Sequence, residues 1–140
     1  MAVNVDIDPA LRGWINAPLE GLAGREEPLA KGVLPDRPRS PGRAVYATLT
    51  VEDHVEGLDA EGVTVGAEVE FTTHAVTTHE ASRLAALALM RHLMALSATR
   101  PVVDGVRLLM AAPVTWPERA DSDSGEYSHT VRATVYAGPV

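Results

Sequence analysis

The segment from Thr78 to Ser97 constrains the fold most, because it has the sequence of a helix that is apolar on nearly every side. Thr77 and Glu80 match a capping box, in which two side chains bond the free N–H groups of a first helical turn. Pro101 marks the end of the helix. The few polar residues within it do not share one face, so we expect burial on more than one side; they are Ser82, Arg83, Arg91 and His92.

A sheet can cover only one side of such a helix. The other side needs the short helix predicted from Pro9 to Ala17, the segment 20–43, or a second copy of the chain. We favour a second copy because the first helix is short, although cover within the monomer stays open. On this interpretation the chain is a subunit of an assembly, and Leu87, Leu89 and Arg91 are candidate interface residues.

Four segments alternate apolar and polar residues, which is the pattern of half-buried strands. They span residues 44–52, 63–72, 106–112 and 127–135, and the first two form a predicted hairpin around a polar connection. We therefore predict one α+β domain over residues 1–140, with a four-stranded, mostly antiparallel sheet, helices packed on one face and the order α-β-β-α-β-β. Glu68 and Glu70 share one strand face, so we expect them to point outward or to line a channel.

Residues 20–43 are rich in proline and glycine and show no periodic pattern. A stretch of this length without regular structure is unusual inside a compact domain. It is either a surface loop that wraps its own domain or an extended arm that lies on a neighbouring subunit. Arg37, Arg39 and Arg43 stand among its prolines, and we list them as candidate interface residues that could bind acidic surface on a neighbour.

Composition excludes several functions. The formal net charge is −7, so the surface repels phosphate and nucleic-acid binding is not expected. The chain has no cysteine, which excludes disulfides, thiolate metal sites and a cysteine nucleophile. The hydrophobic fraction of 46% fits a globular domain, and no apolar run is long enough for a bilayer.

No motif in the sequence carries catalytic or cofactor chemistry. His74 and His79 could approach one another between a strand end and a helix start, but no acidic ligand is spaced beside them. The chain lacks the Gly-x-Ser-x-Gly elbow of hydrolases and the glycine-rich loops that hold nucleotide phosphates. We therefore predict no metal, no cofactor and no enzymatic activity.

The order and spacing of these elements resemble the tail terminator proteins of bacteriophages with long, non-contractile tails. A proline-rich segment, Leu34 to Pro41, stands just before the first long strand. The strand from Ala67 to Phe71 leads through His74 into the capped Ala/Leu-rich helix. A later strand ends at Pro113, an acidic loop follows, and a closing strand carries Tyr127 and Tyr136.

The resemblance implies a structural virion protein rather than an enzyme. Such proteins form rings, typically hexamers, that cap the head-proximal end of the tail tube and stop its polymerisation. The implied partners are other copies of the chain, the tail tube protein and the head-completion (stopper) protein, while genomic DNA passes through without specific binding. The implied location is the virion tail, after synthesis in the host cytoplasm, with no membrane involved. The alternative is a small α+β enzyme or ligand-binding domain with an unrecognised site.

Overall fold

The computed structural model describes residues 6–16, 33–34, 45–55, 57–58, 64–120 and 126–139. Within these ranges the chain forms three helices, which are α1 (Ile7–Ile15), α2 (His79–Met94) and the single turn α3 (Leu96–Thr99). It also forms seven strands, which are β1 (Val33–Leu34), β2 (Tyr46–Val55), β3 (Val65–Ala75), β4 (Val102–Val103), β5 (Val106–Val114), β6 (Glu118–Ala120) and β7 (Tyr127–Pro139).

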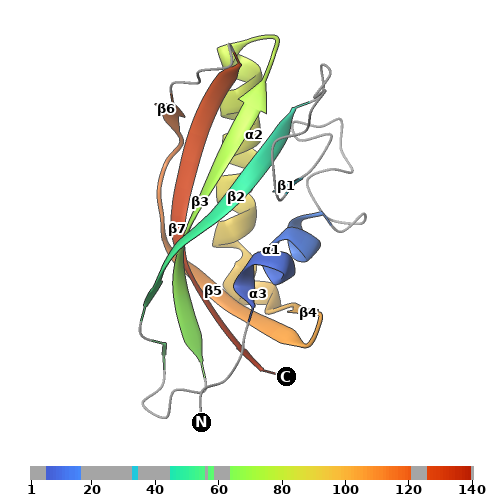
Figure 1. The fold of residues 1–140 in the computed structure, drawn as a ribbon, viewed down its shortest axis with the longest axis vertical. Helices are drawn as coiled ribbons and strands as arrows, with labels where there is room; N and C mark the ends of the chain where they lie inside the picture. Colours follow the sequence, from blue (N-terminus) through green and yellow to red (C-terminus); the bar gives the residue numbers. More distant parts are fainter. Residues whose placement is uncertain are drawn as a thin grey trace.

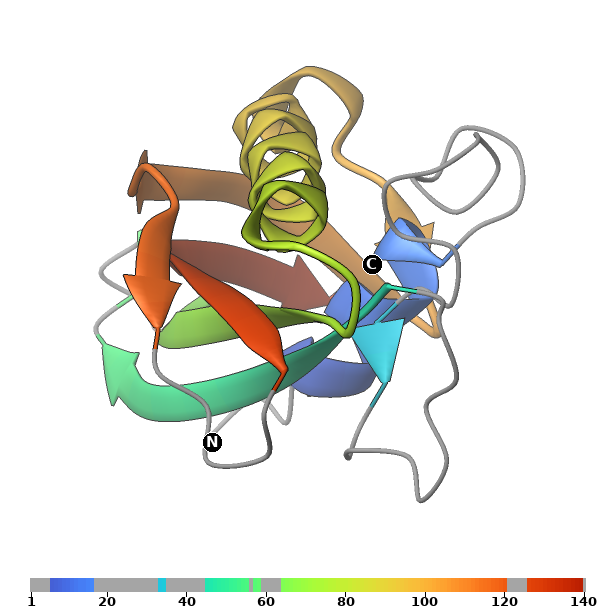
Figure 2. The same cartoon turned by 90° about the horizontal axis from the view of Figure 1, so that it is seen from above.

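The described strands form one sheet in the order β1-β2-β3-β7-β5-β4, and β6 continues along β7 beyond the end of β5. Each pair is antiparallel except β1 with β2, which is parallel. The sheet curls into a half-barrel around α2 (Figures 1 and 2). The prediction of a four-stranded sheet with helices packed on one face is therefore wrong.

Two features explain why the sheet differs from the prediction. β1, β4 and β6 have only two or three residues each, so they are too short to show alternation in the sequence. β2 and β5 contain register shifts, at Val51/Asp53 in β2 and at Leu108/Met110 and Ala111/Val114 in β5. Bulges of this kind raise the local twist and bend a strand, which helps a sheet to curl.

The four long strands lie where alternation predicted them, and the predicted hairpin is confirmed by the antiparallel pairing of β2 with β3. β4 joins β5 through Asp104 and Gly105, whose φ angles of 51° and 78° lie in the left-handed region. Asp-Gly suits such a tight turn because glycine adopts positive φ without steric cost.

One hydrophobic core occupies the inside of the curl. α2 packs on β3, β7 and β5, while α1 packs on β1, β2, β4 and β5 (Figure 1). Phe71, Leu11 and Leu108 are each fully buried in this core. Aliphatic residues make up most of it, as expected for a chain that is only 4% aromatic. None of the described helices is long and apolar enough to cross a membrane.

The helix starts differ by a residue or two from the predicted ones. Thr78, rather than Thr77, is the N-cap of α2, and its hydroxyl accepts a hydrogen bond from the Ala81 N–H at 3.0 Å. Glu80 therefore lies within the first turn, where its carboxylate pairs with Arg83. The predicted capping box is replaced by a single Thr cap with a neighbouring ion pair.

A short part of the proline-rich segment belongs to the sheet of its own domain. Val33 is buried, and β1 pairs with Ala47 and Thr48 of β2. The side chain of Asn16, just after α1, bonds both the N–H and the carbonyl of Val33 at 2.8 Å. The arm predicted from residue 20 to residue 43 is thus fixed to the monomer at this point.

Candidate functional site

The inner face of α2 is a single buried stripe. Its members recur at spacings of three and four residues, which places them on one side of the helix. This inner stripe consists of Ser82, Ala85, Ala86, Leu89, Met90 and Leu93. The monomer therefore buries α2 on one side, and the second side that the sequence leads us to expect is not buried by the described residues.

The opposite face of α2 carries charged side chains together with apolar ones, and two of the apolar ones are exposed. At about 100° per residue, Leu84, Leu87, Arg91 and Met94 lie on the side away from the inner stripe, and we call them the outer stripe. Leu84 is 45% exposed and Met94 is 62% exposed. The α1 helix reaches only the flank of α2, where the rings of Trp14 and His92 stack with centroids 4.0 Å apart.

The structure separates the predicted interface residues. Leu87 is partly buried and Arg91 is exposed, and both belong to the outer stripe. Leu89 is fully buried on the inner stripe, so its place in a subunit interface is corrected: the sheet of the same chain already covers it. Their neighbours in sequence could not reveal this difference, because both leucines stand in the same apolar run. Arg37, Arg39 and Arg43 lie outside the described residues.

Trp116 is the most exposed large apolar side chain in the described part of the chain, at 72%. It stands in the connection between β5 and β6, between Val114 and Pro117. Thr115 fixes this connection to β7, because its N–H donates to the Arg132 carbonyl and its hydroxyl accepts from the Arg132 N–H, each at 2.9 Å. Trp116 was not among the residues predicted from the sequence, although a tryptophan between Pro113 and Pro117 could have indicated an exposed position.

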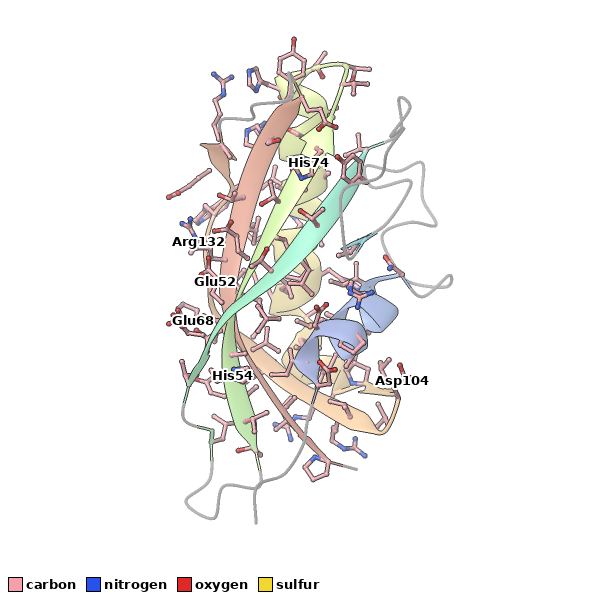
Figure 3. The ribbon with its side chains drawn as sticks, viewed as in Figure 1. Glu52, His54, Glu68, His74, Asp104 and Arg132 are labelled. Carbon is pink, nitrogen blue, oxygen red and sulfur yellow. The ribbon has the colours of Figure 1, made fainter. Side chains whose placement is uncertain are left out.

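The convex face of the sheet carries carboxylates. Glu68 is exposed, and Glu70 pairs with Arg132 at 2.7 Å, so both predicted outward residues lie on the side away from the helices. The ion pair with Glu70 raises the pKa of Arg132. Figure 3 shows Glu52, Glu68 and Arg132 near one another on this face. Together with Pro113, Thr115 and Thr134 they line a shallow groove of about 230 Å³.

A second polar group lies under the first turn of α2, inside the curl. Ser82 donates its only hydroxyl proton to the His79 carbonyl, 3.1 Å away. His129 Nδ1 lies 2.5 Å from the same hydroxyl, so the two side chains share a hydrogen bond. Burial lowers the pKa of His129, and the nearby His79, Arg119 and Arg83 lower it further. These contacts fix the start of α2 on β7.

A third polar group closes the end of the sheet on the convex face. His74 Nε2 lies 3.3 Å from the Thr48 hydroxyl, and His74 Nδ1 lies 3.2 Å from the Ser128 hydroxyl. The Tyr46 hydroxyl donates to Glu126 at 3.1 Å, and Glu126 lies 4.0 Å from His74 Nδ1. Figure 3 places His74 near this end of the sheet, away from Glu68 and Arg132.

This third group contains the residue types of a catalytic triad, a hydroxyl, a histidine and a carboxylate, but it lacks the contacts of a triad. In hydrolases a carboxylate bonds His Nδ1, and His Nε2 bonds the nucleophile. Here Ser128 bonds Nδ1, and the 4.0 Å between His74 and Glu126 exceeds a hydrogen bond. His74 also stacks on the Tyr46 ring, with centroids 4.8 Å apart. The arrangement is therefore first of all a network that ties β2, β3 and β7 together.

The predicted approach of His74 to His79 does not occur, because His74 stacks on Tyr46 on the convex face whereas the ring of His79 meets Tyr127 inside the curl. In the ranges that the structure describes, no group of three or more His, Asp or Glu side chains could hold a metal ion. The chain matches no protein-family model and no curated protein. The described surfaces of the chain, above all the outer stripe of α2, are therefore the features that indicate its function.

Proposed function

We propose that the chain is a structural subunit of a long-tailed bacteriophage, a tail terminator that forms a ring on the head-proximal end of the tail tube. The observation that carries this proposal is the outer stripe of α2. Leu84 and Met94 remain exposed on the longest described helix of a domain whose core is complete without them. A helix with apolar side chains on both faces suits an element that contacts two layers.

The energies favour a partner on this surface. Full burial of an exposed Leu or Met side chain contributes about 1.5–3 kcal/mol. Leu84 and Met94, at 45% and 62% exposed, can each contribute about half of this on contact with a partner. Two such side chains, repeated at every contact of a ring, can stabilise an assembly from subunits that are already folded. The partners in this proposal are further copies of the chain, in a hexamer, together with the tail tube protein and the head-completion (stopper) protein.

The charge distribution fits a channel through which DNA moves. The net charge of the chain is −7, so a ring built from many copies carries a large excess of negative charge. Like charge keeps DNA from adhering to a surface, so a ring with an acidic interior would let the genome pass without specific binding. The location that follows from the proposal is the virion tail.

The experiment has two parts. Native mass spectrometry of the purified chain should show a discrete oligomer several times its mass of 14.9 kDa. Gold-labelled chain, added to tubes of the tail tube protein encoded with it, should bind one end of each tube in electron micrographs and stop further growth. A monomer at every concentration that also leaves tube ends unlabelled would contradict the proposal.

A small enzyme is the second candidate, and the Thr48–His74–Glu126 arrangement is the observation that favours it. The reaction class would be acyl transfer, with Thr48 as nucleophile and His74 as base. The purified chain would then hydrolyse activated esters, and His74→Ala and Thr48→Val would each abolish turnover. Equal rates for the wild-type chain and both variants would exclude this candidate, without bearing on the ring.

A further inference from the structure

We infer that neighbouring subunits meet head to tail, with Trp116 of one copy packed on the outer stripe of α2 of the next copy. The inference rests on the proposed function and gives its subunit contact. Trp116 and the outer stripe occupy different parts of the surface: Figure 2 shows β6 and the end of β5 at one flank of the sheet and α2 across its middle. A contact between two different surfaces can repeat from copy to copy and close into a ring.

Trp116 has the properties of an anchor residue. It is 72% exposed, whereas large aromatic side chains are usually buried for the most part. Its backbone is fixed before any partner arrives, because Thr115 makes two hydrogen bonds with Arg132 of β7. A rigid, exposed tryptophan loses little conformational freedom on binding, and tryptophan is enriched among the residues that dominate interface energies.

The outer stripe offers the groups that suit an indole ring. Leu84 and Met94 are exposed and apolar. A methionine sulfur makes favourable contacts with aromatic rings. Arg91 is exposed on the same stripe, and a guanidinium stacks well on the face of a tryptophan. Each of these side chains lies on α2, so the surface that receives Trp116 is also rigid.

The charges around the two surfaces are opposite. Glu80, at the start of α2, pairs with Arg83, and the chain has no further acidic residue up to Val103. Arg91 and Arg100 are exposed in this stretch. On the other side, Glu118 follows Trp116 closely, with its side chain 71% exposed, and Glu52 and Glu68 line the adjacent groove. Arg132 pairs with Glu70 at 2.7 Å and lies 3.9 Å from Glu118. This surface still has four carboxylates against two guanidinium groups; they belong to Glu52, Glu68, Glu70 and Glu118, and to Arg119 and Arg132. Opposite charges orient the two surfaces toward one another.

Complementary variants test the contact. Trp116→Ala removes the anchor and keeps the stripe, whereas Met94→Glu damages the stripe and keeps the anchor. Alone, each variant should lower assembly by about tenfold or more. Mixed in equal amounts, they should form a heterodimer that grows no further, because one intact contact exists per pair. Mass photometry measures both results, and circular dichroism confirms folding. Leu58→Glu, at a site 53% exposed and outside both surfaces, is the control expected to assemble.

Charge reversal is an independent measurement. Glu118→Arg and Arg91→Glu should each weaken assembly, and the double variant should regain much of the loss. If the Trp116→Ala and Met94→Glu variants both form rings as the wild-type chain does, the inference is wrong and the proposed function stands. The same conclusion follows if Trp116 variants form rings but no longer cap tubes. If the wild-type chain neither assembles nor binds tube ends, both the inference and the proposed function fail.

Discussion

The two stripes of α2 each contain two leucines and one methionine, but these side chains lie in different environments. On the inner stripe, Leu89 is fully buried against the sheet. On the outer stripe, Leu84 is 45% exposed, although it stands only five positions earlier in the same apolar run. The comparison shows that an apolar helix in a sequence does not indicate how much of it the monomer covers.

The difference arises from the sheet rather than from the helix. A curled sheet surrounds one side of α2 and leaves the other side open (Figure 2). In this account the inner stripe stabilises the fold and the outer stripe stabilises the assembly. Substitutions on the two faces should therefore change two different measured quantities.

The largest effect is expected on the inner stripe. Leu89→Ala removes a fully buried side chain and leaves a cavity, which should lower the free energy of unfolding by about 2–5 kcal/mol. Leu84→Ala is the matched control and should change the unfolding of the isolated monomer far less. Urea titration of both variants measures the difference. Equal losses would show that the two faces are equivalent within the monomer.

The outer stripe should control association. Met94→Glu places a charge where we expect a partner, and the loss of contact by a Met that is 62% exposed in the monomer corresponds to a weakening of about tenfold. The unfolding midpoint of the dissociated monomer should stay near that of the wild-type chain. Sedimentation velocity over a range of concentrations measures the association. Unchanged assembly would show that the outer stripe is not part of the subunit interface.

Acid should lower the free energy of unfolding through two histidines, His129 and His92. Burial lowers the pKa of both His129 and His92 in the folded chain, whereas the unfolded chain keeps a value of about 6.5. The unfolded state then binds more protons, so the stability that these residues contribute is present above that pH and is lost as the pH falls below it. Replacing both histidines by Gln should flatten this decline in urea titrations; an unchanged decline would assign it to other groups.

The smallest effect is expected for the ion pair on the convex face. Arg132 bonds Glu70 at 2.7 Å, but its side chain is 54% exposed, so water and salt screen the interaction. Arg132→Ala should leave the urea midpoint within experimental error, with or without added salt. A loss comparable to that of Leu89→Ala would show that the convex face is covered in solution.

Much of the fold could be predicted from the sequence, but not the architecture of the sheet. Alternation located β2, β3, β5 and β7 because each is long and half buried. It could not locate β1, whose two residues depend on hydrogen bonds from Asn16, seventeen positions away. Curvature also depends on bulges that no local pattern predicts, such as the register shift in β2.

The candidate site could be predicted only in part. The apolar run of α2 indicated an excess of apolar surface, and Leu87 and Arg91 do lie on the outer stripe. The assignment of Leu89 was wrong because helical phase relative to the sheet is a tertiary property. Three of the four polar residues on the helical wheel have contacts within the monomer: Ser82 bonds His79 and His129, Arg83 pairs with Glu80, and His92 stacks on Trp14.

The accessibility of position 94 shows whether the outer stripe becomes buried when the chain assembles. Because the chain has no cysteine, Met94→Cys introduces a single thiol on the outer stripe. Its rate of reaction with a water-soluble maleimide can be measured in the dissociated chain and in the ring or at tube ends. We expect rapid labelling of the dissociated chain and strong protection in the assembly. Equally rapid labelling in both states would contradict the claim that the outer stripe is a subunit interface.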